Sequence, residues 1–401
     1  MTTFLQLHLL TAYPPANLNR DDTGRPKTCV FGGAPRLRIS SQSLKRAWRT
    51  SDVFEDKFKD RLAKRTQGLG RIVCDRLIDK GVPAERAEAI ARTLAAIVGA
   101  PSKKGGDQTL TEQLVFLRPE EIKNFEQFAD EIVASKDLQS EFEAASNDGE
   151  EGGTDTEDEG SKKNKAKGSK KDKNKKLDSK RISELRKKLL QERGPNPDMS
   201  MFGRMLADSP QFNVEAAVQI AHALSTHKVA VEDDYYVAVE ELKERIQRED
   251  SGASFIGVQE FAAGLFYLYA CVDVDLLKRN LDGDAALAED AIEALLKSAA
   301  TVAPTGKQAS FASRARATFV MAERGSQQPR SLAAAFLKPV SPVEAGGDLA
   351  LASVERLESF RSALDQAYGD NADAHSTMTA LPGRVNGSLT EIVKFCRKAA
   401  A

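Results

Sequence analysis

The residues best suited to chemistry gather near the start of the chain, in the segment Arg36-Leu37-Arg38-Ile39-Ser40-Ser41-Gln42-Ser43-Leu44-Lys45-Arg46-Ala47-Trp48-Arg49. Residues 1–50 hold eight basic and two acidic side chains, a local charge of +6 in a chain whose formal net charge is −1. A local cationic surface can bind phosphate whatever the total charge is. We therefore expect a phosphate-binding surface in this part of the chain.

The spacing of this segment predicts a strand that leads directly into a helix. Residues 36–39 alternate as a short strand, and Ser40 or Ser41 can cap the helix that follows. The apolar residues of this helix recur at helical spacing and should face the core: Leu44, Ala47 and Trp48.

A phosphate can dock where this helix begins. Backbone N–H groups near Ser41 to Ser43 are free at the positive end of the helix dipole, and the serine hydroxyls and the Gln42 amide add donors. Lys45 and Arg49 are four apart, so they place two cations on one helix face beside this point. The alternative is an ordinary amphipathic helix with a solvated cationic face. The strand-to-helix position and the clustered hydroxyl groups favour phosphate.

Other polar residues make weaker candidates for chemistry. Asp21 and Asp22 could hold Mg²⁺ through hard carboxylate oxygens, but no third ligand is near and Arg20 suggests internal ion pairing of the loop. His222 and His227 lie about 140° apart on a helix, so a core or capping role is favoured over metal binding. We expect no catalytic residue, no metal and no cofactor.

Glycine and cysteine patterns also fit no known chemical site. Gly32-Gly33 and Gly68-Leu69-Gly70 match neither a P-loop nor a dinucleotide fingerprint. The cysteines lie far apart and are expected to be free thiols: Cys29, Cys74, Cys271 and Cys396.

With 401 residues, 41% of them hydrophobic, the chain can bury a sizeable core. Leu5, Leu7 and Leu9 alternate as a half-buried strand, residues 13–33 should be a surface loop, and residues 51–145 should be mostly helical. Further on, we expect helices at 182–193, 213–225, 284–303, 349–368 and 389–398, and strands at 199–205, 255–274 and 318–321. In the 213–225 helix Val214, Val218, Ala221 and Leu224 would be buried, and Asp282 or Asp284 would start the 284–303 helix. This mixture without a regular βαβ repeat predicts the α+β class.

Residues 146–180 change abruptly to an acidic, Gly-rich half and a Lys-rich half with almost nothing apolar, which predicts a disordered insert. A solvated linker is favoured over an auxiliary nucleic-acid tether. No apolar run is long enough for a membrane span and the N-terminus does not resemble a secretion signal, so a cytoplasmic location is expected.

Several motifs together resemble the CasC-type backbone subunit of the type I-E CRISPR Cascade surveillance complex. They are Leu18-Asn19-Arg20-Asp21-Asp22, Phe31-Gly32-Gly33, Arg38 to Ala47, Gly203-Arg204-Met205, Ile220 to His227 and Gly257-Val258-Gln259-Glu260-Phe261. They follow the family's order and cover the chain apart from the insert. The match therefore carries more weight than any one short motif.

The resemblance implies an RRM-like (ferredoxin-like) palm with a helical fingers subdomain and a protruding thumb hairpin. The palm would comprise residues 1–50 and 199–401, the fingers 51–198 with the insert 146–180, and the thumb about 228–254. Copies would stack head to tail along the CRISPR RNA beside other Cascade subunits, with the guide bases left free to pair with target DNA.

The resemblance also implies an RNA-binding set. Lys27, Ser40, Gln42, Lys45 and Arg49 match positions that hold the guide backbone, and Met205 matches a position beside the RNA. The remaining members lie within or beside the matching motifs: Arg20, Arg38, Ser41, Ser43, Arg46 and Arg204. In the thumb, Tyr235, Tyr236 and Val237 match residues that wedge beside a displaced base.

The resemblance implies a non-catalytic protein of antiviral defence. The alternative is a metal-dependent ribonuclease that cuts paired target RNA through Asp22, because type III relatives of this fold use a loop aspartate in that way. A general single-strand binder outside any CRISPR complex is a third reading. The number of copies per complex, the role of the insert and the contacts between the fingers and target DNA are not set by the sequence.

Overall fold

The structure is a computed structural model that describes residues 2–102, 107–146, 177–206, 209–238, 255–343, 345–369 and 372–400. The chain divides into two compact units. Unit 1 comprises Met1–Lys59, Ser200–Phe202 and Ala216–Ala401, and unit 2 comprises Asp60–Met199 and Gly203–Glu215.

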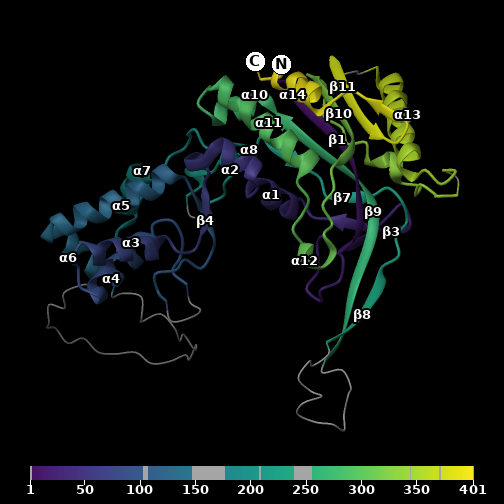
Figure 1. The fold of residues 1–401 in the computed structure, drawn as a ribbon. Coiled ribbons are helices and arrows are strands. Elements are labelled where there is room, and N and C mark those ends of the chain that lie inside the picture. Colours follow the sequence, from purple (N-terminus) through teal and green to yellow (C-terminus); the bar gives the residue numbers. More distant parts are fainter. Residues whose placement is uncertain are drawn as a thin grey trace, which may run out of the picture. The chain divides into compact units, whose positions relative to one another are not determined.

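Unit 1 is built on one antiparallel sheet, which has ten strands in the described residues (Figure 1). Eight of them follow the order β12 (Arg384–Asn386), β11 (Ala374–Leu381), β10 (Ala317–Gly325), β1 (Phe4–Ala16), β9 (Phe255–Asp273), β7 (Ala223–Ser225), β3 (Ala34–Ile39) and β2 (Thr28–Phe31). Two more also pair with β9: β6 (Val218–Ile220) and β8 (Glu232–Ala238).

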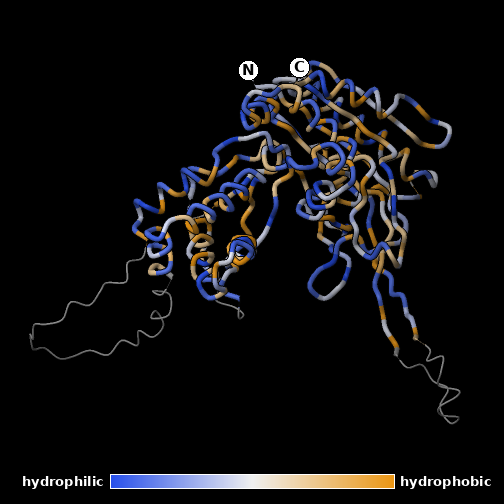
Figure 2. Tube along the Cα trace, turned by 60° about the vertical axis from the view of Figure 1, so that its left-hand side comes forward, coloured by the Kyte–Doolittle hydropathy of each residue, from blue (hydrophilic) through white to orange (hydrophobic). Residues whose placement is uncertain are grey.

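Strand β1 is buried on both faces, so the prediction of a half-buried strand was wrong. It lies between β10 and β9, and Gln6 and His8 are as fully buried as the leucines beside them. Leu10 packs in a core cluster with Val354 and Leu357 of α13 (Leu349–Tyr368), while α11 (Ala285–Thr301) also contacts β1. Hydrophobic and hydrophilic stretches alternate along the chain, as Figure 2 shows, and the neighbouring strands add Leu265 of β9 and Phe319 of β10 to the same core cluster.

Among the described residues, unit 1 also contains helices α1 (Ser41–Arg49), α2 (Asp52–Phe58), α10 (Val274–Asn280), α12 (Gln308–Phe311), α14 (Leu389–Arg397) and the short η4 (Ala333–Phe336). The predicted start of α11 is confirmed, because the Asp284 side chain accepts a hydrogen bond from the backbone N–H of Leu287 at 2.9 Å. Helices α13 and α14 also lie where the sequence predicts them.

Unit 2 is mostly helical, as predicted, with an additional two-stranded sheet. Its helices are α3 (Leu69–Asp79), α4 (Ala84–Ala95), α5 (Pro119–Ala134), α6 (Lys136–Ser146), α7 (Ser179–Leu189), and the short η1 (Lys59–Arg61) and η3 (Pro210–Phe212). Strands β4 (Lys64–Thr66) and β5 (Val115–Leu117) pair with each other. The unit has its own apolar core around Leu77, Leu94 and Phe125.

Two predicted elements have the opposite secondary structure. Residues 199–205 were predicted as a strand, but Pro197–Phe202 form helix α8, with Pro197 at its first position. Residues 213–225 were predicted as a helix, but they contain β6 and β7, both paired with β9. Hydrogen bonding to a long neighbouring strand outweighs the helical spacing of the apolar residues in this segment.

Two loop predictions also need correction. The expected loop at 13–33 begins later, because β1 continues to Ala16, and it contains strand β2. Of the expected insert, residues 147–176 lie outside the described residues, and helix α7 already begins at Ser179 with Asp178 as its cap. The combination of helices with an antiparallel sheet agrees with the α+β class. Within the part of the chain that the structure describes, no helix combines the length and apolar character needed to cross a bilayer.

Candidate nucleic-acid interface

Strand β3 leads into α1 through a single capping residue. The Ser40 hydroxyl oxygen accepts a hydrogen bond from the backbone N–H of Ser43 at 3.3 Å. The Ser43 N–H is therefore engaged, and a docking anion would meet the amides of Ser41 and Gln42, which have no carbonyl partner within the helix. Leu44, Ala47 and Trp48 are buried as predicted. This fixes Lys45, four residues before Arg49, on the side of the helix away from the core.

Lys27 and Arg38 are brought to the start of α1 by backbone hydrogen bonds. The N–H of Arg38 donates to the carbonyl of Lys27 at 2.8 Å, and that of Lys27 donates to the carbonyl of Asn19 at 2.8 Å. The Asn19 side chain then accepts from the N–H of Ser40 at 2.9 Å. We name Lys27, Arg38 and Ser40–Arg49 the basic corner. Asn19, which sequence reasoning did not assign to the site, ties its parts together.

His222 is a second residue that the sequence did not place at this site. Its Nδ1 lies 2.8 Å from an Nη1 atom of Arg38. Burial, with the nearby charges of Arg38 and Lys27, lowers the pKa of His222. A neutral imidazole can accept the guanidinium hydrogen bond, so His222 orients Arg38.

Not every cation near the start of the chain faces solvent. Arg36 is fully buried and donates to the carbonyls of Ser225 at 2.9 Å and Phe336 at 2.7 Å. Arg25 forms an ion pair with Glu260 at 2.7 Å. The local charge of +6 therefore overstates how many cations reach the surface. The cationic surface that remains is the basic corner.

The loop that contains Asp21 and Asp22 is held by Asp21. Its Oδ1 accepts from the backbone N–H of Thr23 at 3.0 Å, the Thr23 hydroxyl at 2.8 Å and the backbone N–H of Arg25 at 2.9 Å, which together lower the pKa of Asp21. The expected ion pairing through Arg20 is replaced by this turn. Across the described ranges, no group of three or more His, Cys, Asp and Glu side chains is placed to hold a metal ion.

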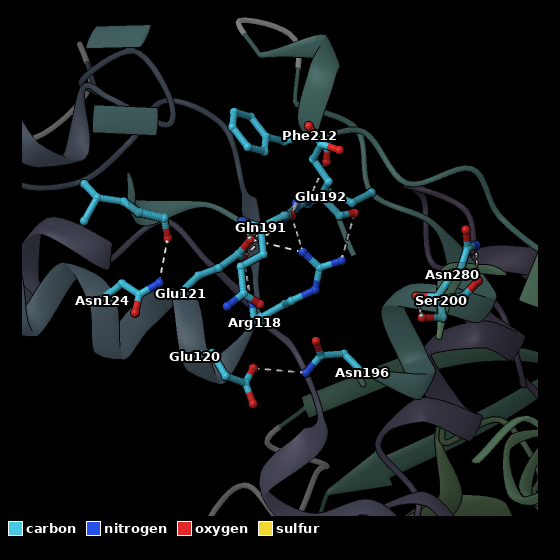
Figure 3. Close-up of polar contacts among 12 residues, drawn as sticks. Arg118, Glu120, Glu121, Asn124, Gln191, Glu192, Asn196, Ser200, Phe212 and Asn280 are labelled. Carbon is cyan, nitrogen blue, oxygen red and sulfur yellow. Dashed lines mark hydrogen bonds and ion pairs between the residues drawn. The ribbon is translucent and has the colours of Figure 1, made fainter. Parts of the chain in front are cut away.

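Arg204 and Met205 both lie in unit 2, but they differ in solvent exposure. Arg204 is buried: its Nη1 lies 2.8 and 2.7 Å from the two carboxylate oxygens of Glu121, and its Nε donates to the carbonyl of Phe212 at 3.0 Å. Arg118 donates to the same carboxylate at 3.2 Å (Figure 3). Arg204, which was predicted to bind RNA, is instead enclosed in this ion-pair network. Met205 is 82% exposed, which suits the predicted contact role.

The hairpin of β8 and residues 255–261 of β9 projects from the sheet of unit 1 (Figure 1). Tyr235 is paired with Val258, and Tyr236 with Gly257. Because side chains alternate along a strand, Tyr235 and Val237 lie on one face of the hairpin and Tyr236 on the other. A Cβ atom at residue 257 would lie 2.5 Å from Cζ of Tyr236. The Tyr236 ring therefore covers Gly257, and the three residues do not form a single surface.

The base of this hairpin is anchored by the motif that contains Gly257. Glu260 pairs with Arg25, and the Glu260 carbonyl accepts from the Asn17 side chain at 3.0 Å. Gln259 accepts from Lys307 at 3.1 Å. The motif thus joins the hairpin to the loop that also carries Asn19 and Lys27.

These features define a mixed α/β protein with a basic strand-to-helix corner, a projecting hairpin with exposed aromatic residues, and a second helical unit. Residues 5–392 match a family model described as "CT1975-like protein". The chain belongs to this CT1975-like family.

The chain is also similar to chains of solved CRISPR surveillance complexes. A chain of a "CRISPR RNA-guided surveillance complex, pre-nicking" is 28% identical, with a TM-score of 0.77 over 99% of this chain and 100% of that one. A chain of a "CRISPR RNA-guided surveillance complex" is 25% identical, with a TM-score of 0.68 and coverage of 99% of both chains. No curated protein sequence matches the chain. The resemblance to CasC-type backbone subunits is confirmed.

Proposed function

We propose that this protein binds the guide RNA of a CRISPR surveillance complex as its repeating, non-catalytic backbone subunit. The observation that carries the proposal is the basic corner, where Lys27, Arg38 and Lys45 surround the start of α1. Such a corner holds sugar and phosphate groups and reads no base, as a protein that accepts any guide sequence requires. Family membership and the two structural matches support the same role.

The finer parts of the proposal come from the family resemblance. Unit 1 corresponds to the RRM-like palm, unit 2 to the fingers, and the β8–β9 hairpin to the thumb. Copies stack head to tail along the RNA in the cytoplasm, together with other Cascade subunits, and the guide bases pair with target DNA. Support within this chain comes from the exposed ring of Tyr235, which suits base stacking without sequence preference, and from the exposed Val237 on the same face of the hairpin.

Charge reversal at Lys45 and Arg49 tests the proposal. We expect Lys45→Glu with Arg49→Glu to weaken guide binding equally for unrelated guide sequences, because phosphate contacts carry no sequence information. Loss of two contacts to a single strand lowers the slope of log affinity against log salt by about 1.4. Fluorescence anisotropy with labelled RNAs over a salt series measures both quantities.

Helix α14 offers a charge-matched control, since Lys394 and Lys398 are exposed and, like Lys45 and Arg49, four residues apart. Lys394→Glu with Lys398→Glu changes the net charge by the same amount and should leave the salt slope unchanged. A loss of binding that depends on the guide sequence would contradict the proposal. Regular cleavage of complementary RNA with Mg²⁺, abolished by Asp22→Ala, would instead favour the nuclease alternative.

A further inference from the structure

Two hollows lie side by side along one flank of α1. The first, of about 540 Å³, is bounded by residues 18–22, Ser43 and Arg46. The second, of about 510 Å³, is bounded by residues 50–53, 301–303 and 314–316. Ala47, Thr50 and Thr305 line both. The two hollows therefore adjoin at these three residues, and we name them together the α1 groove.

The α1 groove faces a different side of the helix from the pair Lys45 and Arg49. Ser43, Arg46 and Thr50 are spaced by three and four residues, so they share one helix face. Lys45 and Arg49 line neither hollow. Arg46 belongs to the basic corner and also lines the first hollow, so the cationic surface extends from the corner into the groove.

The far wall of the groove is residues 302–316, which sequence reasoning did not connect with the site. This segment packs closely on the loop after β1, because a Cβ atom at Gly306 would collide with the carbonyl oxygens of Leu18 and Asn17. The Gln308 side chain donates to the carbonyl of Pro304 at 2.9 Å. The wall is thus held in place before any ligand arrives.

This wall presents two arginines to solvent. Arg314 and Arg316 are exposed on either side of Ala315, and all three line the groove. In the part of the chain that the structure describes, no carboxylate pairs with Arg314 or Arg316. The acidic residues of the groove are Asp21, engaged by its own turn, the exposed Asp22, and Asp52 in the first turn of α2.

We propose that the α1 groove holds a further stretch of the RNA sugar-phosphate chain, with Arg314 and Arg316 as phosphate contacts beyond those of the basic corner. A long, open groove with cations at both ends, Arg20 and Arg46 at one and the two arginines at the other, fits a polyanion better than a compact ligand. This inference rests on the proposed function and adds a second wall to the same RNA site.

Anisotropy with two labelled single-stranded RNAs of unrelated sequence, bound to the full chain over a salt series, tests the inference. We expect Arg314→Glu with Arg316→Glu to weaken binding roughly tenfold and to lower the salt slope by about 1.4. Arg314→Lys with Arg316→Lys should keep most of the slope, because a lysine still neutralises a phosphate. Lys394→Glu with Lys398→Glu is the control, and Arg314→Gln with Arg316→Gln replaces the reversal if that variant does not fold.

Each outcome separates this inference from the proposed function. If the Lys45 and Arg49 reversal weakens binding but the Arg314 and Arg316 reversal leaves affinity and slope unchanged, the groove is no RNA site and the inference is overturned. If RNA binding is intact but pairing with labelled complementary DNA is weakened, the groove holds the target strand, which also overturns it. If the unsubstituted chain binds neither RNA, the proposed function itself fails.

Discussion

At the scale of single residues, burial separates the arginines of this chain into two groups. Arg36 and Arg204 are enclosed and donate to carbonyl or carboxylate oxygens, whereas Arg20, Arg46, Arg314 and Arg316 are exposed. Motif membership gives no information on this division, since Arg204 lies in a family motif. What distinguishes Arg204 is its contact with Glu121, a residue 83 positions away in sequence. The sequence cannot show such a pairing.

We therefore expect Arg204→Met to act on stability. The substitution leaves Glu121 buried with Arg118 as its remaining cation. Removing one partner of a buried ion pair typically lowers the free energy of unfolding by about 3–5 kcal/mol. Chemical denaturation followed by far-UV circular dichroism measures the change. Arg193→Met, at an exposed arginine of the same unit, should be close to neutral. A variant Arg204→Met that keeps its stability but binds RNA more weakly would support the predicted RNA-binding role of Arg204 instead.

The buried His8 predicts a dependence of stability on pH. Burial lowers the pKa of His8 below its ordinary value of 6.5, and this outweighs the opposing effect of Glu323. A neutral imidazole whose Nε2–H donates to Glu323 can also accept from the Tyr267 hydroxyl at 2.9 Å. The unfolded chain then binds more protons, so the stabilisation is complete above about pH 6.5 and is lost as the pH falls towards the lowered pKa.

Urea midpoints of the Trp48 fluorescence transition over this pH range check that expectation. Trp48 is the single tryptophan of the chain and is buried in unit 1, as is His8. His8→Gln should remove most of the fall in the urea midpoint below pH 6.5. His227, whose pKa burial also lowers, accounts for part of the remainder. If the urea midpoint falls with pH just as steeply in the His8→Gln variant, another group is responsible for the pH dependence.

At the scale of elements, the sequence predicted well those elements whose signals are local. The strand, cap and helix at 36–49 were found as expected, because Ser40 can cap α1 without help from distant residues. The same holds for α11, with its own cap at Asp284. The segment 213–225 was predicted wrongly because its apolar spacing suits a helix, while β9 supplies strand partners from about 50 residues away. Likewise the α1 groove needs residues 302–316, which only the fold brings to α1.

The two faces of the β8–β9 hairpin should respond differently to substitution. Tyr235→Ala removes an exposed ring beside Val258, and we expect it to weaken assembly on RNA by about 1–3 kcal/mol if a base stacks there. Tyr236→Ala uncovers Gly257 and should loosen the hairpin itself. Hydrogen exchange of the β8 amides reports the second effect. Equal exchange in both variants would mean that Tyr236 has no supporting role.

At the scale of the whole molecule, the two units have separate apolar cores and should unfold as separable transitions. Phe125→Ala in unit 2 should cost about 3–5 kcal/mol, because it leaves a cavity among buried residues. Circular dichroism should then show an early loss of helix, while the Trp48 signal of unit 1 keeps its midpoint. Coincident shifts of both signals would show instead that the units unfold together.

Strand β9 runs without interruption from the projecting hairpin to the centre of the sheet, pairing first with β8 and then with β1. Side chains therefore alternate along one strand from the core out to Phe255. Adding or deleting one residue near Ala262 would exchange the outward surfaces of the hairpin, whereas a change of two would preserve them. Natural variation in the length of this strand should therefore occur in even steps.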